Sequence, residues 1–279
     1  MPELPEVEAV ATALRPLVAK RRIRCAHIFH PIATRPQPAV RLVTMAEGRR
    51  IEKVSRLGKN LLLELDRGVL LLHFKLDGQL LWFSNARELM KRANAKPGGV
   101  HVDVAFELNG GVLGFADGRH FGRVTAWDSK ASIPGLRKLG VDALSREFTP
   151  RSLRERLAKS IRPVKEFLLD QTKVAGVGNI YSGESLWHSR ISPLRRANSL
   201  SAAEASRLHK AIVSVLRRAL ECCLHPAPDF SDPSWWFQGL DRILRVYGRE
   251  GERCRRCGHA IQRIEQAGRS TYYCPHCQH

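Results

Sequence analysis

Four cysteines near the C-terminus form two Cys-x-x-Cys pairs, and this spacing constrains the fold more than any other feature of the sequence. Cys254 and Cys257 form the first pair, and Cys274 and Cys277 follow after sixteen intervening residues. Each pair lets two thiolates from one tight turn reach the same ion, and the stretch between the pairs has the length of a β-hairpin. The pattern predicts a tetrahedral four-cysteine zinc site. Three nearby histidines are competing ligand candidates, at positions 259, 276 and 279.

The charge balance indicates a polyanionic partner. The chain has 279 residues and a formal net charge of +19, from 46 Lys and Arg against 27 Asp and Glu. This excess is more than solubility requires and makes nucleic acid the first candidate. No apolar run has the length of a membrane-spanning helix, and the longest, Val69 to Leu72, is strand-sized. The acidic start does not have the pattern of a secretory signal, so we expect a cytoplasmic, nucleoid-associated protein without a membrane partner.

The order of sequence patterns predicts an α+β protein. Apolar residues recur at helical spacing over residues 3–20, and short apolar or alternating runs over 21–128 indicate an antiparallel sandwich or barrel. Helical periodicity returns after residue 150, and Ser201 with Glu204 forms a capping-box pattern before the longest helix, residues 202–222. We therefore predict a β-sandwich domain at 1–130, a connector at 131–150, a helical DNA-binding domain at 151–238 and a zinc-finger module at 239–279.

A turn with two glycines around Asn179 joins two of the predicted helices. Gly176 and Gly178 would let the backbone approach another chain closely, and Asn179 could cap the second helix. The free amides of that helix end form a site for phosphate. By spacing alone, an ordinary helix–helix turn and a DNA clamp explain this segment equally well.

The N-terminus offers a catalytic amine if Met1 is removed. An α-amino group has a pKa of roughly 7.7–8.0, so a useful fraction is unprotonated at neutral pH. The secondary amine of Pro2 would form an iminium with the anomeric carbon of a sugar, and Glu3 and Glu6 could shuttle protons. The alternative is structural, because Pro and Glu also start helices and complement the helix dipole.

Several motifs in a fixed order resemble the formamidopyrimidine-DNA glycosylase family, which also includes the endonuclease VIII enzymes. The similarity covers nearly the whole chain. Its motifs are Pro2 to Glu8, Gly58-Lys59-Asn60, Asp117 to Gly122, Asp170 to Tyr181, Val246 to Arg249, and Gly268 to Thr271. The family fold implies an N-terminal antiparallel β-sandwich with flanking helices, followed by a helix-two-turn-helix domain and a four-cysteine zinc finger.

The resemblance also implies roles for individual residues. Pro2 matches the Schiff-base nucleophile, Glu3 the general acid, and Lys59 the lysine at the lesion; Glu6 is a weaker candidate for lesion contact. The target base must be extruded from the duplex before reaction, at a cost of roughly a few kcal/mol. The matching wedge residues, which refill the hole, are Leu76, Arg119 and Phe121. The remaining predicted DNA contacts are His73, Lys165, Asn179, Tyr247 and Arg269.

Departures from the family pattern affect which lesion we expect the protein to prefer. Leu76 stands where methionine is common, and His120 replaces a frequent second arginine. The run from Leu224 to Asp229 differs from the Gly-Gly-Thr-Thr of members that remove 8-oxoguanine, and the aromatic run 235–237 is also unlike them. These aromatic residues could stack on the extruded base or pack against the protein.

Three hypotheses for the function follow. The first is a bifunctional glycosylase and abasic-site lyase acting on ring-opened or oxidised purines, such as formamidopyrimidine and 8-oxoguanine, in double-stranded DNA. The second applies the same chemistry to oxidised pyrimidines or bulkier lesions. The third is a non-catalytic zinc-dependent DNA-binding protein, against which the presence of Pro2, Glu3 and Lys59 together argues. For all three we expect a monomer with one structural zinc ion and no organic cofactor.

Overall fold

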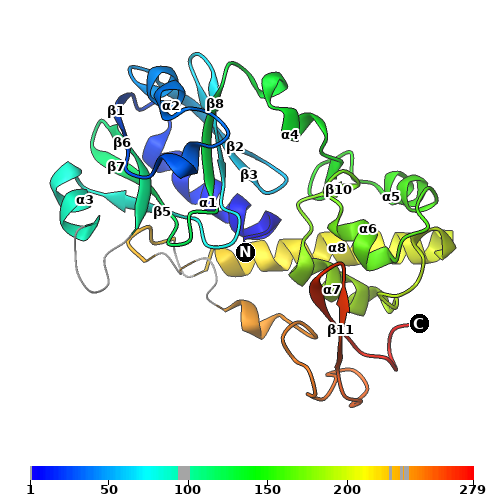
Figure 1. The fold of residues 1–279 in the computed structure, drawn as a ribbon. Helices are drawn as coiled ribbons and strands as arrows, with labels where there is room; N and C mark the ends of the chain where they lie inside the picture. Colours follow the sequence, from blue (N-terminus) through cyan, green and yellow to red (C-terminus); the bar gives the residue numbers. More distant parts are fainter. Residues whose placement is uncertain (1, 94–100, 226–227, 233–234, 236–238) are drawn as a thin grey trace. The chain divides into compact units, whose positions relative to one another are not determined.

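The computed structural model describes residues 2–93, 101–225, 228–232, 235 and 239–279. The chain divides into two compact units (Figure 1). Unit 1 comprises Met1–Arg137 and Cys223–Gln238, and unit 2 comprises Lys138–Cys222 and Gly239–His279. No helix in the described part of the chain is long and apolar enough to cross a membrane. The predicted α+β class is confirmed.

Two four-stranded antiparallel sheets form the centre of unit 1. The first has the order β1-β6-β7-β5 and the second β2-β3-β4-β8. The bounds of the strands are Ile23–Ile28 for β1, Ile51–Leu57 for β2, Asn60–Leu65 for β3, Val69–His73 for β4, Gln79–Phe83 for β5, Val102–Leu108 for β6, Gly111–Ala116 for β7 and Arg123–Trp127 for β8. Among the described residues, β1 and β5 are the edge strands of the first sheet, and β2 and β8 are those of the second. Neither sheet therefore closes into a barrel, and the two sheets form a sandwich.

The predicted N-terminal helix is confirmed as α1 (Leu4–Val18), which lies against β2 and β3. Its apolar positions at helical spacing are fully buried, as expected for an amphipathic helix on a sheet. Glu8 on its polar side accepts hydrogen bonds from Arg15 at 3.0 Å and from Arg56 of β2 at 2.8 Å. The bond from Arg56, together with one from Arg15 Nε to Val54 O of β2 at 3.2 Å, fixes the position of α1 on the sheet.

Helices that the sequence patterns did not predict flank the sheets. They are α2 (Ala39–Ala46), α3 (Ala86–Ala93) and the 3-10 helix η1 (Pro31–Thr34). Leu42 and Ala46 of α2 are fully buried. The segment 131–150 also contains short elements: η2 (Lys130–Ser132) overlaps its start, and α4 (Pro134–Arg137) and β9 (Val141–Asp142) follow. Short helices escape detection because they contain too few turns to show a period.

The described part of the loop after residue 223 packs against unit 1. Trp82 N donates a hydrogen bond to Phe230 O at 3.2 Å, so this segment attaches to β5. Phe230 and Trp235 are buried, and their rings meet edge to face with centroids 5.8 Å apart. Of the two roles considered for the aromatic residues, Trp235 therefore has the packing role. Trp236 and Phe237 lie outside the described residues.

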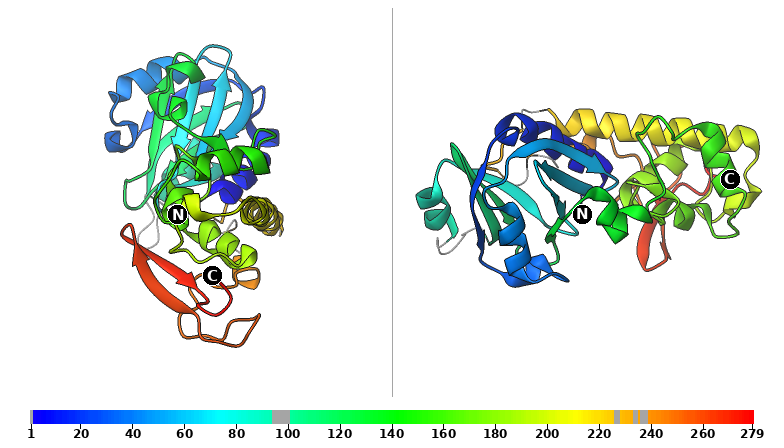
Figure 2. Two further views of the ribbon diagram at one scale, coloured as in Figure 1. Left: turned by 90° about the vertical axis from the view of Figure 1, so that its right-hand side faces the viewer. Right: turned by 90° about the horizontal axis from the view of Figure 1, so that it is seen from above.

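Unit 2 is mainly helical. Its α-helices are α5 (Pro150–Leu157), α6 (Val164–Leu169), α7 (Asn179–Ser189) and α8 (Ala202–Cys223), the long yellow helix that is seen along its axis in the left view of Figure 2. The 3-10 helices are η3 (Ala197–Ser199) and η5 (Leu240–Arg242). The predicted capping box of α8 is confirmed, because Ser201 N donates to Glu204 at 2.8 Å and Glu204 N to Ser201 Oγ at 3.3 Å.

Two small sheets complete unit 2. β9 pairs in parallel with β10 (Val174–Ala175), and β11 (Gln262–Gln266) pairs with β12 (Arg269–Tyr273) as an antiparallel hairpin beside α7. The hairpin turn consists of Ala267 and Gly268, which have φ values of 49° and 69°. Positive φ at both turn residues is the signature of a type I′ turn, whose twist matches that of the strands.

A truncation in the core of unit 1 tests this packing. Leu81 of β5 is fully buried in a cluster with Phe83, Leu89 and Val102. Because Leu81→Ala leaves a cavity there, we expect the free energy of unfolding to fall by about 2–5 kcal/mol. Urea denaturation followed by circular dichroism measures this loss. Val40→Ala, at an exposed position, should change the value by less than about 0.5 kcal/mol, and equal effects of the two variants would contradict the packing described.

Candidate functional site

Two buried carboxylates follow Pro2 at the start of α1. Pro2 is buried, Glu3 is the N-cap residue of the helix, and Glu3 and Glu6 are each 1% exposed. Glu3 N donates a hydrogen bond to Glu6 Oε2 at 2.8 Å, so the carboxylate of Glu6 fixes the backbone of Glu3. The helix dipole stabilises negative charge at this end. Met1 lies outside the described residues.

Lys59 occupies the tight turn between β2 and β3. Leu57 pairs with Asn60 across this turn, and Gly58 before Lys59 has a φ of 58°. A hairpin turn with positive φ at its first central residue favours glycine there, which explains the Gly-Lys order. Lys59 is only 8% exposed, so it is not the solvated turn lysine that its position in a hairpin would suggest.

His73 lies beside Lys59 at the end of β4 and is electrically neutral. It pairs with Asn60, the residue after Lys59, in the β3–β4 ladder. Burial, with the positive charges of Lys75 and Lys59, lowers the pKa of His73 from 6.5 to about 3. Lys75 N donates to His73 Nδ1 at 3.0 Å. Since Nδ1 accepts this bond, the ring proton is on Nε2, which can donate to a ligand.

The three predicted wedge residues lie on two connected turns. Asp77, next to Leu76, forms an ion pair with Arg119, and the Arg119 guanidinium lies 5.8 Å from the centre of the Phe121 ring. Leu76 is 39% exposed and Phe121 49%, unusually high for such large apolar side chains. Two exposed apolar groups beside a cation are suited to insertion between stacked bases.

The turn that carries Arg119 and Phe121 is held by a buried carboxylate. Asp117 is 1% exposed, and its two oxygens accept hydrogen bonds from Arg119 N at 2.9 Å and Gly122 N at 2.6 Å. A side chain at Gly122 would collide with Phe115, because a Cβ there would lie 2.5 Å from the ring. The backbone of the turn is thus fixed while its side chains are exposed.

In unit 2, Asn179 connects α7 to the C-terminal hairpin. The prediction that Asn179 caps α7 is wrong: Gly178 is the N-cap residue, and Asn179 is the first residue of the helix. Its side-chain Nδ2 instead donates to Ser270 O at 3.0 Å, next to Arg269. Local spacing could not reveal this bond, because the partner lies 91 residues away. The bond places Asn179 beside the residue that follows Arg269 in the hairpin.

Lys165 is a buried residue that binds the backbone of Asn179. Lys165 is 1% exposed, and its Nζ donates to Asn179 O at 3.3 Å. The structure therefore places this predicted DNA contact inside unit 2, where its ammonium group holds the backbone at the start of α7. A second positioning group, Glu184, was missed by the sequence reasoning. The only signal for it is a glutamate among the small and apolar residues of α7.

Glu184 fixes the segment that contains Tyr247. It is 1% exposed, and its carboxylate accepts hydrogen bonds from three successive backbone amides, Arg245 N at 2.8 Å and Val246 N and Tyr247 N at 2.9 Å each. The ring of Tyr247 meets that of Tyr272 in β12 edge to face, with centroids 5.3 Å apart. Tyr247 is thereby positioned beside the hairpin that carries Arg269.

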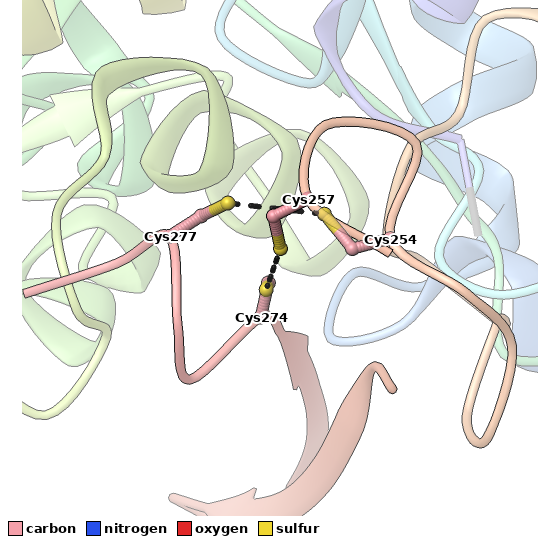
Figure 3. Close-up of side chains that lie close together, drawn as sticks. All are labelled: Cys254, Cys257, Cys274 and Cys277. Carbon is pink, nitrogen blue, oxygen red and sulfur yellow. Dashed lines mark hydrogen bonds between the residues drawn. The ribbon is translucent and has the colours of Figure 1, made fainter. Parts of the chain in front are cut away.

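The four cysteines converge on one point (Figure 3). Their Sγ atoms all lie within 4.8 Å of one another, with 4.0 Å between Cys254 and Cys277 and 3.5 Å between Cys257 and Cys274. A tetrahedron with Zn–S bonds of about 2.3 Å has sulfur–sulfur edges of about 3.8 Å. The cluster therefore fits a zinc ion.

The surroundings of the cysteine cluster support the same interpretation. Trp187 of α7 packs on the cluster and donates its Nε1–H to Cys254 Sγ at 3.4 Å, and Arg256 N lies 3.5 Å from the same sulfur. Such donors stabilise thiolate charge. His259 and His276 are exposed and stack on each other at 4.1 Å, outside the complete set of four sulfurs.

Comparisons with known proteins cover the whole chain. Three family models match: the formamidopyrimidine-DNA glycosylase N-terminal domain at residues 1–124, the formamidopyrimidine-DNA glycosylase H2TH domain at 139–225, and a zinc finger found in FPG and IleRS at 251–279. The formamidopyrimidine-DNA glycosylase of Thermus thermophilus is 40% identical over 284 residues, covering 100% of this chain and 98% of that protein. The corresponding protein of Desulfitobacterium hafniense is 35% identical over the full length of both chains.

Solved structures show the same similarity. The crystal structure of the MutM (Fpg) protein from Thermus thermophilus has a TM-score of 0.83 and 38% identity, and covers 99% of this chain and 98% of that one. The complex of Lactococcus lactis Fpg with DNA containing an abasic site has a TM-score of 0.86 and 32% identity, with 99% of each chain covered. The helix-two-turn-helix domain and the zinc finger expected from the sequence are confirmed, and this chain belongs to the formamidopyrimidine-DNA glycosylase family.

Proposed function

We propose that this protein is a base-excision-repair DNA glycosylase with abasic-site lyase activity, which removes ring-opened or oxidised purines through a Schiff base on Pro2. The observation that carries the proposal is the arrangement at the start of α1, where two buried carboxylates directly follow a proline. Both carboxylates take part in the capping box of α1, in which Glu3 N donates to Glu6 Oε2 at 2.8 Å. Capping alone does not require these carboxylates to be buried, and the burial of both directly after Pro2 supports a role in proton transfer.

The Pro2 amine is a suitable nucleophile once Met1 is removed. The positive end of the α1 dipole disfavours an ammonium ion, so it favours the free amine at neutral pH. The nitrogen bonds to C1′ of the deoxyribose as the bond to the base breaks and the base leaves with a proton. Opening of the sugar ring then gives an iminium. Transfer of a proton from C2′ to a general base then expels the 3′ phosphate.

Glu3 and Glu6 have different parts in this reaction. We assign proton transfer to Glu3, which donates to the departing base or the ring oxygen and later accepts a proton. Glu6 acts through Glu3, since its carboxylate already accepts the Glu3 amide proton. Lys59 supplies a positive charge close to the lesion, in a buried position where charge interacts more strongly than in water.

The two turns that carry Leu76, Arg119 and Phe121 explain how the protein could reach the damaged nucleotide. C1′ of a stacked nucleotide cannot be reached within the duplex, so the nucleotide must be extruded. Leu76 and Phe121 would fill the vacated space, and Arg119 would face the orphaned base. Asn179, Tyr247 and Arg269 would hold the phosphates that flank the extruded nucleotide, and His73 would donate one further hydrogen bond.

Purine lesions are the proposed substrates because the opening motif follows the formamidopyrimidine branch of the family. A mutant of Lactococcus lactis Fpg has been solved with DNA containing Fapy-dG, and the wild-type protein with DNA containing an oxidised pyrimidine. The structure with an oxidised pyrimidine supports oxidised pyrimidines as the alternative substrates. The run 224–229 supports the same alternative, because it departs from the sequence of members that remove 8-oxoguanine. We further propose that the protein acts as a monomer, with one structural zinc ion and no organic cofactor.

Borohydride trapping tests the nucleophile. Protein that lacks Met1, as verified by mass, is mixed with duplexes carrying an abasic site, formamidopyrimidine, 8-oxoguanine or an oxidised pyrimidine. We expect sodium borohydride to reduce the iminium to a stable protein–DNA adduct, most abundantly with formamidopyrimidine among the damaged bases. Pro2→Gly should reduce adduct formation strongly, and Glu3→Gln should slow base removal by about 10²–10⁴-fold.

Pro5→Ala is the matched control, because it replaces the other proline of the opening motif and leaves the Pro2 amine intact. It should form the adduct as the unmodified protein does. If no substrate gives an adduct with protein that binds DNA and contains zinc, the chain is instead a non-catalytic DNA-binding protein.

The protonation of His73 can be measured directly. With a pKa of about 3, the His73 ring should not titrate in NMR spectra between about pH 5 and 8, and its proton should reside on Nε2. A neutral donor that binds a phosphate does not release the counterion of that phosphate. His73→Asn should therefore weaken DNA binding without changing how the binding constant depends on salt concentration. Arg269→Ala should instead lower the slope of log K against log salt by about one. A His73 titration close to neutral pH would contradict this assignment.

Zinc removal should unfold the C-terminal module and weaken DNA binding. Trp187 is the single tryptophan of unit 2 and contacts Cys254, so its fluorescence reports on the cluster. We expect a chelator to change the emission and to weaken binding to duplex DNA, because the hairpin that carries Arg269 loses its cross-link. Trp187→Phe should remove most of the spectral change. Unaltered DNA binding by protein shown to lack zinc would refute a structural role for the ion.

A further inference from the structure

A second group of metal-ligand side chains lies in unit 1, far in sequence from the cysteines. It consists of His30, which follows β1, Asp103 of β6, and His120 in the turn between β7 and β8. One potential ligand atom of each residue lies within 4.8 Å of the others. The imidazole rings of His30 and His120 have centroids 4.7 Å apart.

In this group, one carboxylate oxygen of Asp103 is buried without a hydrogen-bond partner among the described residues. It is fully buried, and its Oδ1 lies 2.7 Å from His120 Nδ1. Its Oδ2 is also buried and has no hydrogen-bond partner among the described residues. A buried carboxylate oxygen without a partner is costly. A bound cation would satisfy the oxygen and stabilise the carboxylate.

The backbone holds the three residues in place without an ion. Asp103 O accepts hydrogen bonds from Phe29 N at 2.9 Å and His30 N at 3.1 Å, which fix the segment after β1 beside β6. His120 N donates to Asp117 O at 3.1 Å, and His120 has a φ of 55°. This left-handed conformation is uncommon for a residue other than glycine. The backbones of the three ligand residues, which come from three separate segments, are therefore held in place.

We propose that His30, Asp103 and His120 form a second metal site, for a divalent transition ion such as Zn²⁺. Two imidazoles and one carboxylate are a ligand set used for zinc and for iron, with the remaining positions taken by water. A simpler interpretation is that Asp103 only fixes His120 by a hydrogen bond. That interpretation accounts for Oδ1, but it leaves Oδ2 and the adjacent ring of His30 unexplained.

An ion at this site would act on the turn that carries the exposed side chains. His120 lies between Arg119 and Phe121, whereas Asp103 belongs to β6 and His30 follows β1, the edge strand that pairs with β6. Coordination would tie the turn to this sheet edge. The state of the metal site would thus control how freely Arg119 and Phe121 move, whatever their partner.

The test counts zinc in untagged, full-length protein with the cysteine site loaded. The protein is dialysed against buffered micromolar Zn²⁺, and bound zinc is measured by elemental analysis. We expect His30→Ala and Asp103→Asn to bind one ion fewer than the unmodified protein. Comparing variants cancels any zinc held by the exposed pair His259 and His276, which share Cys257 with the cysteine site.

His27→Ala is the matched control. His27 lies in β1 and is hydrogen-bonded to a carboxylate, Glu107, at 2.7 Å, as His120 is to Asp103, but it belongs to no group of three ligands among the described residues. It should bind as much zinc as the unmodified protein. Equal zinc in His30→Ala and the unmodified protein would overturn the proposal, as would an equal loss in His27→Ala and His30→Ala.

A second measurement avoids reliance on Asp103→Asn, which alters a buried residue. Amide hydrogen exchange in residues 117–122 should slow when zinc is added to protein whose cysteine site is already loaded. His30→Ala changes an exposed side chain, so it should fold normally and lose this effect. Exchange that is insensitive to zinc in the unmodified protein, or slowed equally in His30→Ala, would also overturn the proposal.

Discussion

Buried carboxylates that accept backbone hydrogen bonds determine the geometry of both units. Removing a carboxylate from water is costly unless donors replace the water, and in this protein the donors are backbone amides. Glu6 binds the amide of Glu3, Asp117 those of Arg119 and Gly122, and Glu184 those of residues 245–247. In each case at least one of these amides belongs to a predicted functional residue, namely Glu3, Arg119 or Tyr247. The acidic side chains of this strongly basic protein thus fix the positions from which other groups act.

This arrangement separates rigidity from exposure. A side chain that is to enter DNA must be accessible before binding, and an exposed apolar side chain gains nothing from the protein's own core. Leu76 and Phe121 are exposed, yet the turn beneath Phe121 is fixed by Asp117, and Asp77 links the two turns through Arg119. For the insertion into DNA that we propose for Leu76 and Phe121, less conformational entropy would then be lost on binding than if the turns were ordered only at that moment.

The features that were predictable from the sequence are those encoded by local spacing. The cysteine pairs, the period of α1 and the Ser201–Glu204 capping box each involve residues close in sequence, and all are present. The role of Asn179 as a cap was predicted wrongly, because its amide finds a partner in Ser270, which no local pattern indicates. Glu184 was missed for the same reason, since its three partners lie 61–63 residues away. Motif resemblance implied separate phosphate contacts for Asn179 and Arg269, whereas the bond that holds Asn179 beside Ser270 required the fold.

The neighbouring groups at the ends of β3 and β4 show how the fold divides roles between similar residues. Lys59 and His73 are both basic types and lie beside each other in a buried region, where two like charges repel strongly. Burial lowers the pKa of His73 most, and the positive charges of Lys75 and Lys59 lower it further, so His73 is neutral. The result is an uncharged hydrogen-bond donor beside Lys59. A site of this kind can attract an anionic group through Lys59 and orient it through the directional hydrogen bond of His73.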